Sequence, residues 1–372
     1  MQTNRILILD FGSQVTMLIA RRLRELGYYS EIKSYQTPLE EIKKFNPKAV
    51  ILSGGPFSVY ETESPTKNVK EMLDIAPVLG ICYGMQLLAH QMGGSVESAK
   101  HREYGHKEIQ WVENFTTIKH KIPLKHNVWM SHGDVVTQIP SDAKLLCKTQ
   151  DHIAGFYSDR YWALQYHPEV SHSEYGSEVL ELFMKHFGIH ADWNAQSLFD
   201  NCSHEVLKLV KADEHVLCAL SGGVDSSVVA TLLTKVLGAE RVHCVFINNG
   251  LLRLNEFENV LEQYKKIGLN VIGLDKTKEF LVALRGLSDP EKKRKAIGKT
   301  FIDVFDQSIN EELKSHKDKI KFLAQGTLYP DVIESVSSVG GSVTIKSHHN
   351  VGGLPDKMKL KLVEPVRYLF KD

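Results

Sequence analysis

The sequence predicts an α/β protein of two domains, each built on a mainly parallel sheet flanked by helices. Its 372 residues exceed what one hydrophobic core normally supports, since a single domain commonly holds about 100–200 residues. Short apolar runs alternate with longer amphipathic runs in both halves, which is typical of repeated strand–helix units. Residues 188–203 contain no convincing strand and several Asp and Asn residues. We therefore expect domains at 1–190 and 204–372, joined by a linker at 191–203.

In the first half, apolar runs predict buried parallel strands and amphipathic runs predict helices. The strands are expected at 5–9, 49–52 and 78–81, and the helices at 15–26, 83–92 and 176–187. Between residues 107 and 164 the apolar pieces become shorter, which is more typical of an antiparallel extension.

The second half repeats the alternation from residue 205 onward. Helices are expected at 205–211, 226–236 and 257–267, and strands at 216–220, 242–247, 271–274 and 322–324. The charged stretch 290–321 has a helical pattern.

Composition excludes several classes of protein. The 45 basic and 45 acidic residues cancel, which gives no electrostatic reason to expect nucleic acid or an anionic membrane as a partner. Five cysteines without C-x-x-C spacing argue against a disulfide framework and a zinc knuckle. We find no targeting or membrane-spanning segment, so a cytoplasmic location is expected.

Cys82 has the local sequence of a nucleophile elbow. It lies in Gly-Ile-Cys-Tyr-Gly at residues 80–84, where an apolar strand-like run turns into a helical pattern. Glycine two residues to either side leaves room for the turn, and a helix N-terminus favours a thiolate. Taken singly, a glycine-flanked cysteine is more often a small packed side chain.

A cysteine nucleophile needs a base and donors for the oxyanion. His167 and Glu169 follow a predicted strand, and Pro168 between them restricts the backbone so that the carboxylate can orient the imidazole. The backbone N–H groups of Gly55 and Tyr83 are candidates for the oxyanion hole. The glycines of Ser-Gly-Gly-Pro at 53–56, which follow the predicted strand at 49–52, could simply form a turn. All these motifs follow predicted strands, where α/β folds bind ligands, and this favours a catalytic site.

Four motifs resemble those of class I glutamine amidotransferases, in the family's order and spacing, over about residues 1–190. They are Ser-Gly-Gly-Pro at 53–56, Gly-x-Cys-x-Gly-x-Gln at 80–86, Ser-His-Gly-Asp at 131–134 and His-Pro-Glu at 167–169. The resemblance implies that Cys82 attacks the glutamine side-chain amide, that His167 passes a proton to ammonia, and that Glu169 orients His167. It also implies that the glutamine is held by the following residues: Gln86, Ser131, His132, Gly133 and Asp134.

The second half contains a candidate phosphate-binding loop between a predicted strand and a predicted helix. Hydroxyl and backbone N–H groups there can bind pyrophosphate at a helix N-terminus, and Asp225 could hold Mg²⁺. The alternative is a Ser/Gly-rich turn with a helix cap. The loop lacks the Gly-Lys-Ser/Thr ending of a P-loop, and neither half has the dinucleotide fingerprint G-x-G-x-x-G. The loop residues are Ser221, Gly222, Gly223, Val224, Asp225, Ser226 and Ser227.

This loop resembles that of ATP pyrophosphatases. Four further motifs accompany it: Asn-Gly-Leu-Leu-Arg at 249–253, Gln-Gly-Thr-Leu-Tyr-Pro-Asp at 325–331, Lys-Ser-His-His-Asn at 346–350 and Val-Glu-Pro at 363–365. With these motifs the chain resembles the GMP synthetase family along essentially its whole length. The resemblance implies that XMP, ATP and glutamine are converted to GMP through an adenyl-XMP intermediate, with AMP and pyrophosphate released. It also implies a homodimer formed through a C-terminal domain that would follow Asp372. Asn248 stands where the family more often has aspartate. Candidate XMP or phosphate contacts, which could equally be a charged face or surface histidines, are Arg253, Lys299, Asp331, Lys346, His348 and His349.

Two other functions stay open. The chain could be an adenylating amidotransferase that acts on a different carbonyl acceptor, or a non-catalytic sensor of glutamine or nucleotide. Intact Cys82, His167 and Glu169 argue against the sensor.

Overall fold

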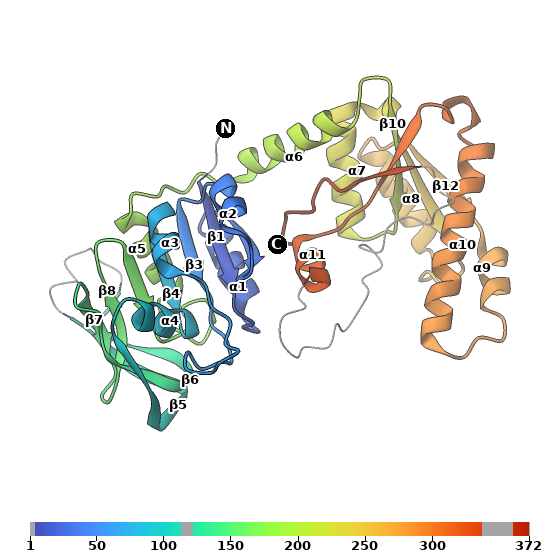
Figure 1. Ribbon diagram of the computed structural model, residues 1–372. Coiled ribbons are helices and arrows are strands. Elements are labelled where there is room, and N and C mark those ends of the chain that lie inside the picture. The colour runs from blue at the N-terminus through green and yellow to red at the C-terminus, as the bar shows by residue number, and fades with distance from the viewer. Residues whose placement is uncertain (1–3, 113–121, 337–359, 372) are drawn as a thin grey trace. The chain divides into compact units, whose positions relative to one another are not determined.

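The structure is a computed structural model that describes residues 4–112, 122–336 and 360–371. The chain divides into two compact units, with the division between Asn194 and Ala195, inside the stretch where the sequence places the linker. In the described residues no helix is long and apolar enough to cross a membrane. Figure 1 shows the elements of each unit, and the two units are described separately.

The first unit contains a mixed nine-stranded sheet in the order β2-β1-β3-β4-β9-β8-β7-β5-β6. Pairings from β2 to β9 are parallel, and those from β9 to β6 are antiparallel. The mainly parallel sheet predicted for this half is therefore confirmed only from β2 to β9. The antiparallel extension expected between residues 107 and 164 is present, because strands joined by short connections pair antiparallel. The strands are β1 (Arg5–Asp10), β2 (Tyr29–Ser34), β3 (Ala49–Leu52), β4 (Val78–Ile81), β5 (Ser95–Trp111), β6 (Lys125–Gln138), β7 (Lys144–Lys148), β8 (Ile153–Tyr157) and β9 (Tyr161–Leu164).

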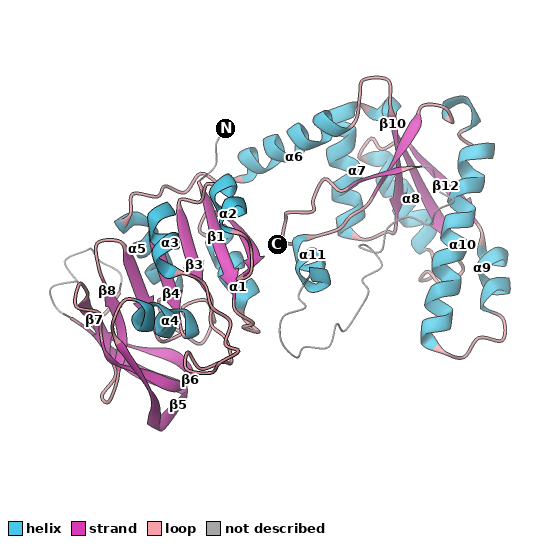
Figure 2. Ribbon diagram, viewed as in Figure 1, coloured by secondary structure: helices cyan, strands magenta, loops and turns pink. Residues whose placement is uncertain are grey.

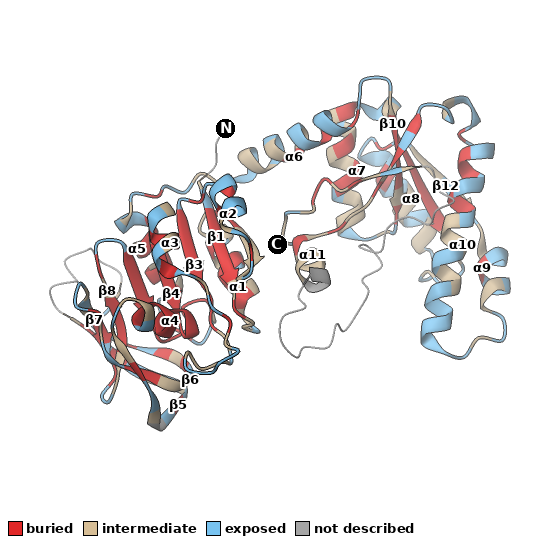
Figure 3. Ribbon diagram, in the orientation of Figure 1, coloured by how far each residue is buried: buried red, intermediate tan, exposed pale blue. Residues whose placement is uncertain are grey.

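Helices cover both faces of the parallel part of this sheet (Figure 2). One face packs against α2 (Leu39–Phe45), α3 (Val69–Ile75) and α4 (Tyr83–Gln91). Helices α1 (Thr16–Glu25) and α5 (Gly176–His186) contact each other. Strands β3, β4 and β9 are buried along their whole length, as Figure 3 shows, and this explains why they are continuous apolar runs in the sequence.

The second unit contains a five-stranded sheet in the order β12-β11-β10-β13-β14, and every pairing is parallel. This confirms the prediction of a parallel sheet for this half. The strands are β10 (His215–Leu220), β11 (Val242–Asn248), β12 (Val271–Asp275), β13 (Ile320–Ala324) and β14 (Lys361–Val363).

Side chains that alternate along β10 and β11 build two cores in the second unit. Cys218 and Phe246 belong to the core that includes residues of α6 (Ala195–Leu209), α7 (Val224–Leu237) and α8 (Glu256–Lys266). Leu217 and Val245 belong to the core beneath α9 (Thr277–Leu284) and α10 (Pro290–Glu311). The last helix among the described residues is α11 (Tyr329–Val336).

The chain order places a switch point in the second sheet. From β10 the sheet grows through β11 and β12 on one side, and then through β13 and β14 on the other. Ligands of open α/β sheets bind outside the carboxyl ends of the strands at such a point. The loops that follow β10 and β13 are therefore the expected ligand-binding loops of this unit.

Candidate active sites

Cys82 occupies the sharp turn between β4 and α4. Its φ of 53° and ψ of −107° put a non-glycine residue in a strained conformation, as expected for a nucleophile elbow. A Cβ at Gly80 would lie 2.5 Å from the carbonyl oxygen of Gly84, and a Cβ at Gly84 would overlap the backbone of Leu52. Both glycines are needed because the helix starts directly against β3 and β4.

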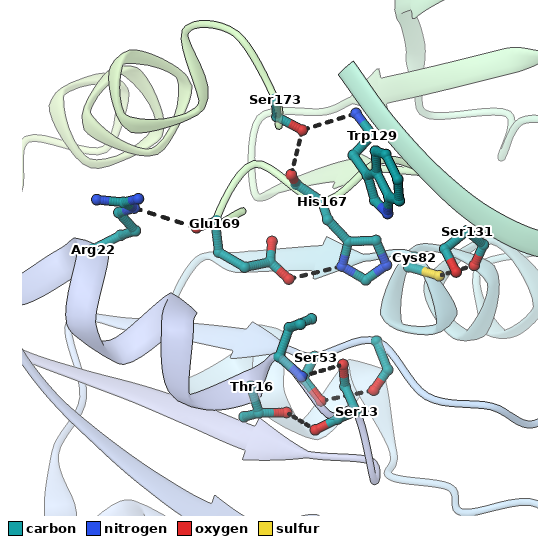
Figure 4. Close-up of polar contacts among 12 residues, drawn as sticks. Ser13, Thr16, Arg22, Ser53, Cys82, Trp129, Ser131, His167, Glu169 and Ser173 are labelled. Carbon is teal, nitrogen blue, oxygen red and sulfur yellow. Dashed lines mark hydrogen bonds and ion pairs between the residues drawn. The ribbon is translucent and has the colours of Figure 1, made fainter. Parts of the chain in front are cut away.

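Figure 4 shows Glu169, His167 and Cys82 in a row. The Nδ1 atom of His167 lies 2.7 Å from Oε1 of Glu169, and all three side chains are buried. Burial opposes a charged imidazole. The charge of Glu169 and the hydrogen bonds to Cys82 and Glu169 outweigh it, so the pKa of His167 is raised well above its usual value. This places an imidazole that is easily protonated between a thiol and a carboxylate.

The Gly54–Gly55 turn after β3 lies beside these groups. A Cβ at Gly54 would be 3.0 Å from Cε1 of His167 and 3.5 Å from Cβ of Cys82, whereas a Cβ at Gly55 would meet the carbonyl oxygen of Phe11 at 2.7 Å. In the described residues, the backbone N–H groups of Gly55 and Tyr83 have no hydrogen-bond partner. Both are therefore available as donors.

Most residues expected to hold glutamine have internal partners. The amide nitrogen of Gln86 donates to the carbonyl oxygen of Asp134 at 2.9 Å, which ties α4 to β6. The buried ring of His132 lies 3.2 Å from Oε2 of the buried Glu103, and the thiol of Cys82 donates to the carbonyl oxygen of Ser131 at 3.7 Å. A Cβ added at Gly133 would have only the side chain of Arg102 within 4 Å.

Three residues that the sequence analysis did not single out hold the backbone of 167–169. Ser173 donates its hydroxyl to the carbonyl oxygen of His167 at 2.6 Å, and Arg22 donates Nε to the carbonyl oxygen of Glu169 at 3.3 Å. A Cβ at Gly176 would overlap the carbonyl oxygen of Pro168. No sequence motif marks these contacts, because each partner belongs to a different element.

In the second unit, the candidate phosphate loop follows β10 and runs into α7. The helix begins at Val224 rather than at the predicted residue 226, with Gly223 as its N-cap. Gly222 has a φ of +80°, a conformation that favours glycine. The hydroxyl of Ser226 lies 3.1 Å from that of Ser221 and accepts the Ser221 N–H at 3.2 Å. The loop is thus closed by its own serine hydroxyls.

Ser227 and Asp225 face different neighbours on the first turn of α7. The Ser227 hydroxyl lies 3.0 Å from the hydroxyl of Tyr264 on α8. A Cβ at Gly326, in the loop after β13, would lie 3.6 Å from that of Asp225. The Asp225 carboxylate also forms a 3.4 Å ion pair with Lys371. The two loops that flank the switch point therefore meet at Asp225.

The remaining candidate contacts belong to other segments of the chain. Arg253 and Lys299 are exposed, and neither forms an ion pair within the described ranges. The carboxylate of Asp331 accepts the N–H of Leu328 at 2.9 Å and so supports the start of α11. Lys346, His348 and His349 lie outside the described residues.

Comparisons with known proteins agree with this division of the chain. The family described as glutamine amidotransferase class-I matches residues 7–187, and the family described as NAD synthase matches residues 197–297. The GMP synthase [glutamine-hydrolyzing] of Bdellovibrio bacteriovorus is 59% identical over 98% of this chain and 71% of its own length. The proteins of that name from Christiangramia forsetii and Cytophaga hutchinsonii are 50% and 49% identical, over 99% and 100% of this chain and 72% of their own lengths.

The matches define a class I glutamine amidotransferase domain followed by an ATP pyrophosphatase domain. Identity to the glutamine-hydrolysing GMP synthases extends over nearly the whole chain. The chain belongs to the GMP synthase family.

Proposed function

We propose that this chain catalyses glutamine-dependent amination of XMP to GMP, with ATP cleaved to AMP and pyrophosphate. The observation that carries the proposal is the coexistence of two sites in one chain. One is the buried row of Cys82, His167 and Glu169, and the other is the serine-rich loop at the switch point of the second sheet. The first suits release of ammonia from glutamine, and the second suits nucleotide activation of an acceptor.

In the first unit, the Cys82 sulfur attacks the side-chain carbonyl carbon of glutamine and forms a tetrahedral intermediate. The N–H groups of Tyr83 and Gly55, which have no partner among the described residues, stabilise its oxyanion. His167 takes the thiol proton and gives it to the leaving nitrogen, so that ammonia departs as the C–N bond breaks. Water, deprotonated by His167, then cleaves the thioester to glutamate. Glu169 holds the imidazole in orientation throughout.

The contacts of Gln86 and His132 indicate an indirect role in holding glutamine. Both side chains are buried and hydrogen-bonded to β5 or β6, so they fix the wall of the pocket. We infer that Ser131, Gly133 and Asp134 contribute mainly through their backbone, since the Ser131 carbonyl already contacts the Cys82 thiol.

In the second unit, the loop Ser221–Ser227 would bind the pyrophosphate part of ATP through hydroxyl and N–H groups at the N-terminus of α7. Asp225 fits Mg²⁺, because its carboxylate is partly exposed at the edge of the loop and Mg²⁺ commonly takes one or two carboxylates together with substrate phosphates. The ion would neutralise phosphate charge. The XMP carbonyl oxygen attacks the α-phosphorus of ATP and pyrophosphate leaves, which gives the adenyl-XMP intermediate. Ammonia then attacks the activated carbon and AMP leaves.

A product assay on the wild-type chain tests the proposal. With XMP, ATP, Mg²⁺ and glutamine, we expect equal amounts of GMP, AMP, pyrophosphate and glutamate. ADP as the main nucleotide product would contradict the pyrophosphatase assignment. Amination of another acceptor, with no GMP formed from XMP, would contradict XMP as the acceptor.

Three further expectations belong to the same proposal. The domains are taken as 1–190 and 204–372 with the linker 191–203, and the family resemblance implies a homodimer formed through a C-terminal domain. Sedimentation of the protein tests dimerisation. The five cysteines are free thiols, which supports the reducing cytoplasm as the location of the protein.

A further inference from the structure

The backbone of His167 is held to β6 by a closed set of hydrogen bonds. Its N–H donates to the carbonyl oxygen of Trp129 at 3.1 Å. The Trp129 N–H donates to the Ser173 hydroxyl at 2.9 Å, and that hydroxyl donates to the His167 carbonyl oxygen at 2.6 Å. Figure 4 shows Ser173 between the two residues. One hydroxyl, acting as acceptor and donor, completes a pairing that two strands would otherwise make directly.

We propose that Ser173 is a positioning residue for the glutaminase reaction. It fixes the position of the His167 imidazole relative to the Cys82 thiol. The proposal rests on the proposed function of the Cys82 site. Strand β6 also carries Ser131, whose carbonyl oxygen contacts the Cys82 thiol. The same strand therefore sets the position of both the nucleophile and the base, and Ser173 connects the base to it.

The site offers no substitute for this hydroxyl. Ser173 is 7% exposed, so water has little access to the two backbone groups that it joins. Alanine would leave the Trp129 N–H and the His167 carbonyl oxygen without this partner, and the loop could then move away from β6. A displacement of about 1 Å at a catalytic group can lower a rate by about 10²-fold.

Ser173→Ala should lower kcat for glutamate release by roughly 10- to 100-fold, with KM for glutamine nearly unchanged. Ser173→Thr keeps the hydroxyl and should restore most of kcat. Cysteine is close to serine in size, but its thiol forms only weak hydrogen bonds, so kcat of Ser173→Cys should stay low. Ammonia-driven GMP formation, which depends on the second unit, should be unaffected in all three variants.

Glu174→Ala is the matched control. Glu174 is exposed and ties the same loop to β6 through the Asn127 N–H at 2.8 Å, but no hydrogen bond joins it to His167 in the described chain. The kcat of Glu174→Ala for glutamate release should stay close to that of wild type. An equal loss of kcat in Glu174→Ala would overturn the proposal, because general loop attachment would then explain the effect. Unchanged kcat in Ser173→Ala or Ser173→Cys, or no recovery in Ser173→Thr, would also overturn it.

Alkylation of Cys82 by iodoacetamide separates this proposal from the function on which it rests. Reaction of the Cys82 thiol depends on the nearby imidazole and needs no glutamine. Ser173→Ala should therefore alkylate more slowly than wild type and Glu174→Ala, after subtraction of the Cys82→Ala background. A wild-type chain that releases no glutamate would contradict the proposed function while leaving this comparison intact. Equal alkylation rates in wild type and Ser173→Ala would contradict the positioning role.

Discussion

The two candidate sites are built in opposite ways. Cys82, His167 and Glu169 are at most 6% exposed, and Cys82 has a strained backbone. Hydrogen bonds join this group of residues to α1, β6 and β9. In the second unit, Ser221 and Gly223 are exposed, and the loop is closed mostly by bonds among its own residues. Attack on an amide needs a thiol, a base and an oxyanion hole in fixed positions, whereas binding ATP requires an open loop that a large anion can enter.

The largest expected difference between the sites concerns their glycines. Gly84→Ala should destabilise the first unit by about 3 kcal/mol or more, because the new Cβ overlaps the backbone of Leu52. Gly223→Ala should be mild, since its nearest neighbour is the Ser221 hydroxyl at 3.2 Å. All four tryptophans precede residue 195, so tryptophan fluorescence follows unfolding of the first unit in Gly84→Ala, and calorimetry follows the second unit in Gly223→Ala. Equal destabilisation by the two changes would contradict the comparison.

Loss of the carboxylate tests the fixed geometry of the first site. Glu169→Gln should lower kcat for glutamate release by about tenfold or more, because the imidazole keeps its place but loses its charged partner. Ammonia-driven GMP synthesis should not change. Wild-type glutaminase activity in this variant would remove Glu169 from the mechanism.

The same substitution has a pH signature. The raised pKa of His167 means that the charged ring stabilises the folded first unit below pH ~6.5, and that this contribution is lost as pH rises through the raised value. The difference in unfolding free energy between wild type and Glu169→Gln should therefore shrink at alkaline pH. A difference that grows with pH would show that the carboxylate does not stabilise a charged imidazole.

The second unit should respond to pH with the opposite sign. Burial, followed by the charges of His316 and His215, lowers the pKa of His243 to about 4. The unfolded chain takes up a proton near pH ~6.5 that the folded unit accepts only near pH 4. Stability should thus fall by on the order of 1–3 kcal/mol as pH drops across this range.

His243→Phe should flatten that dependence and add a constant loss, because the His215 ring loses its partner at 2.9 Å. Calorimetry can measure the second transition once fluorescence has assigned the first. An unchanged slope between pH 6.5 and 4 would show that His243 does not titrate as its environment indicates.

The smallest effect is expected at the exposed edge of the phosphate loop. Lys371 is 62% exposed and pairs with Asp225 at 3.4 Å, so Lys371→Ala should change stability by no more than about 0.5 kcal/mol. KM for ATP should stay within about twofold of wild type. A much larger loss of stability, or a much larger rise in KM for ATP, would mean that this site, too, depends on fixed contacts.

Much of the fold was predictable because fully buried strands are continuous apolar runs. Strands β3 and β4 were predicted with their observed bounds, and they end at the Gly54–Gly55 turn and at Cys82. Strand β2 (Tyr29–Ser34) was missed because it is an edge strand with only two buried residues. Helix α9 (Thr277–Leu284) was also missed, since only Phe280 is buried on it.

The site was predictable where neighbours in sequence are also neighbours in space. His167 and Glu169 are two residues apart, and the structure shows them in contact. Ser173 contacts Trp129 44 residues away, and Glu103 contacts His132 across the β5–β6 pairing. Such contacts depend on strand register, which short motifs do not encode.

The central claim is that the thiol of one unit supplies ammonia to separate synthetic chemistry in the other, and Cys82→Ala tests it most directly. Glutamate release and glutamine-driven GMP formation should be abolished, because alanine cannot form the thioester. GMP formation driven by added ammonia should continue at the rate that wild type shows with the same ammonia. Glutamate release at the wild-type rate, or loss of the ammonia-driven reaction in a folded variant, would contradict the account.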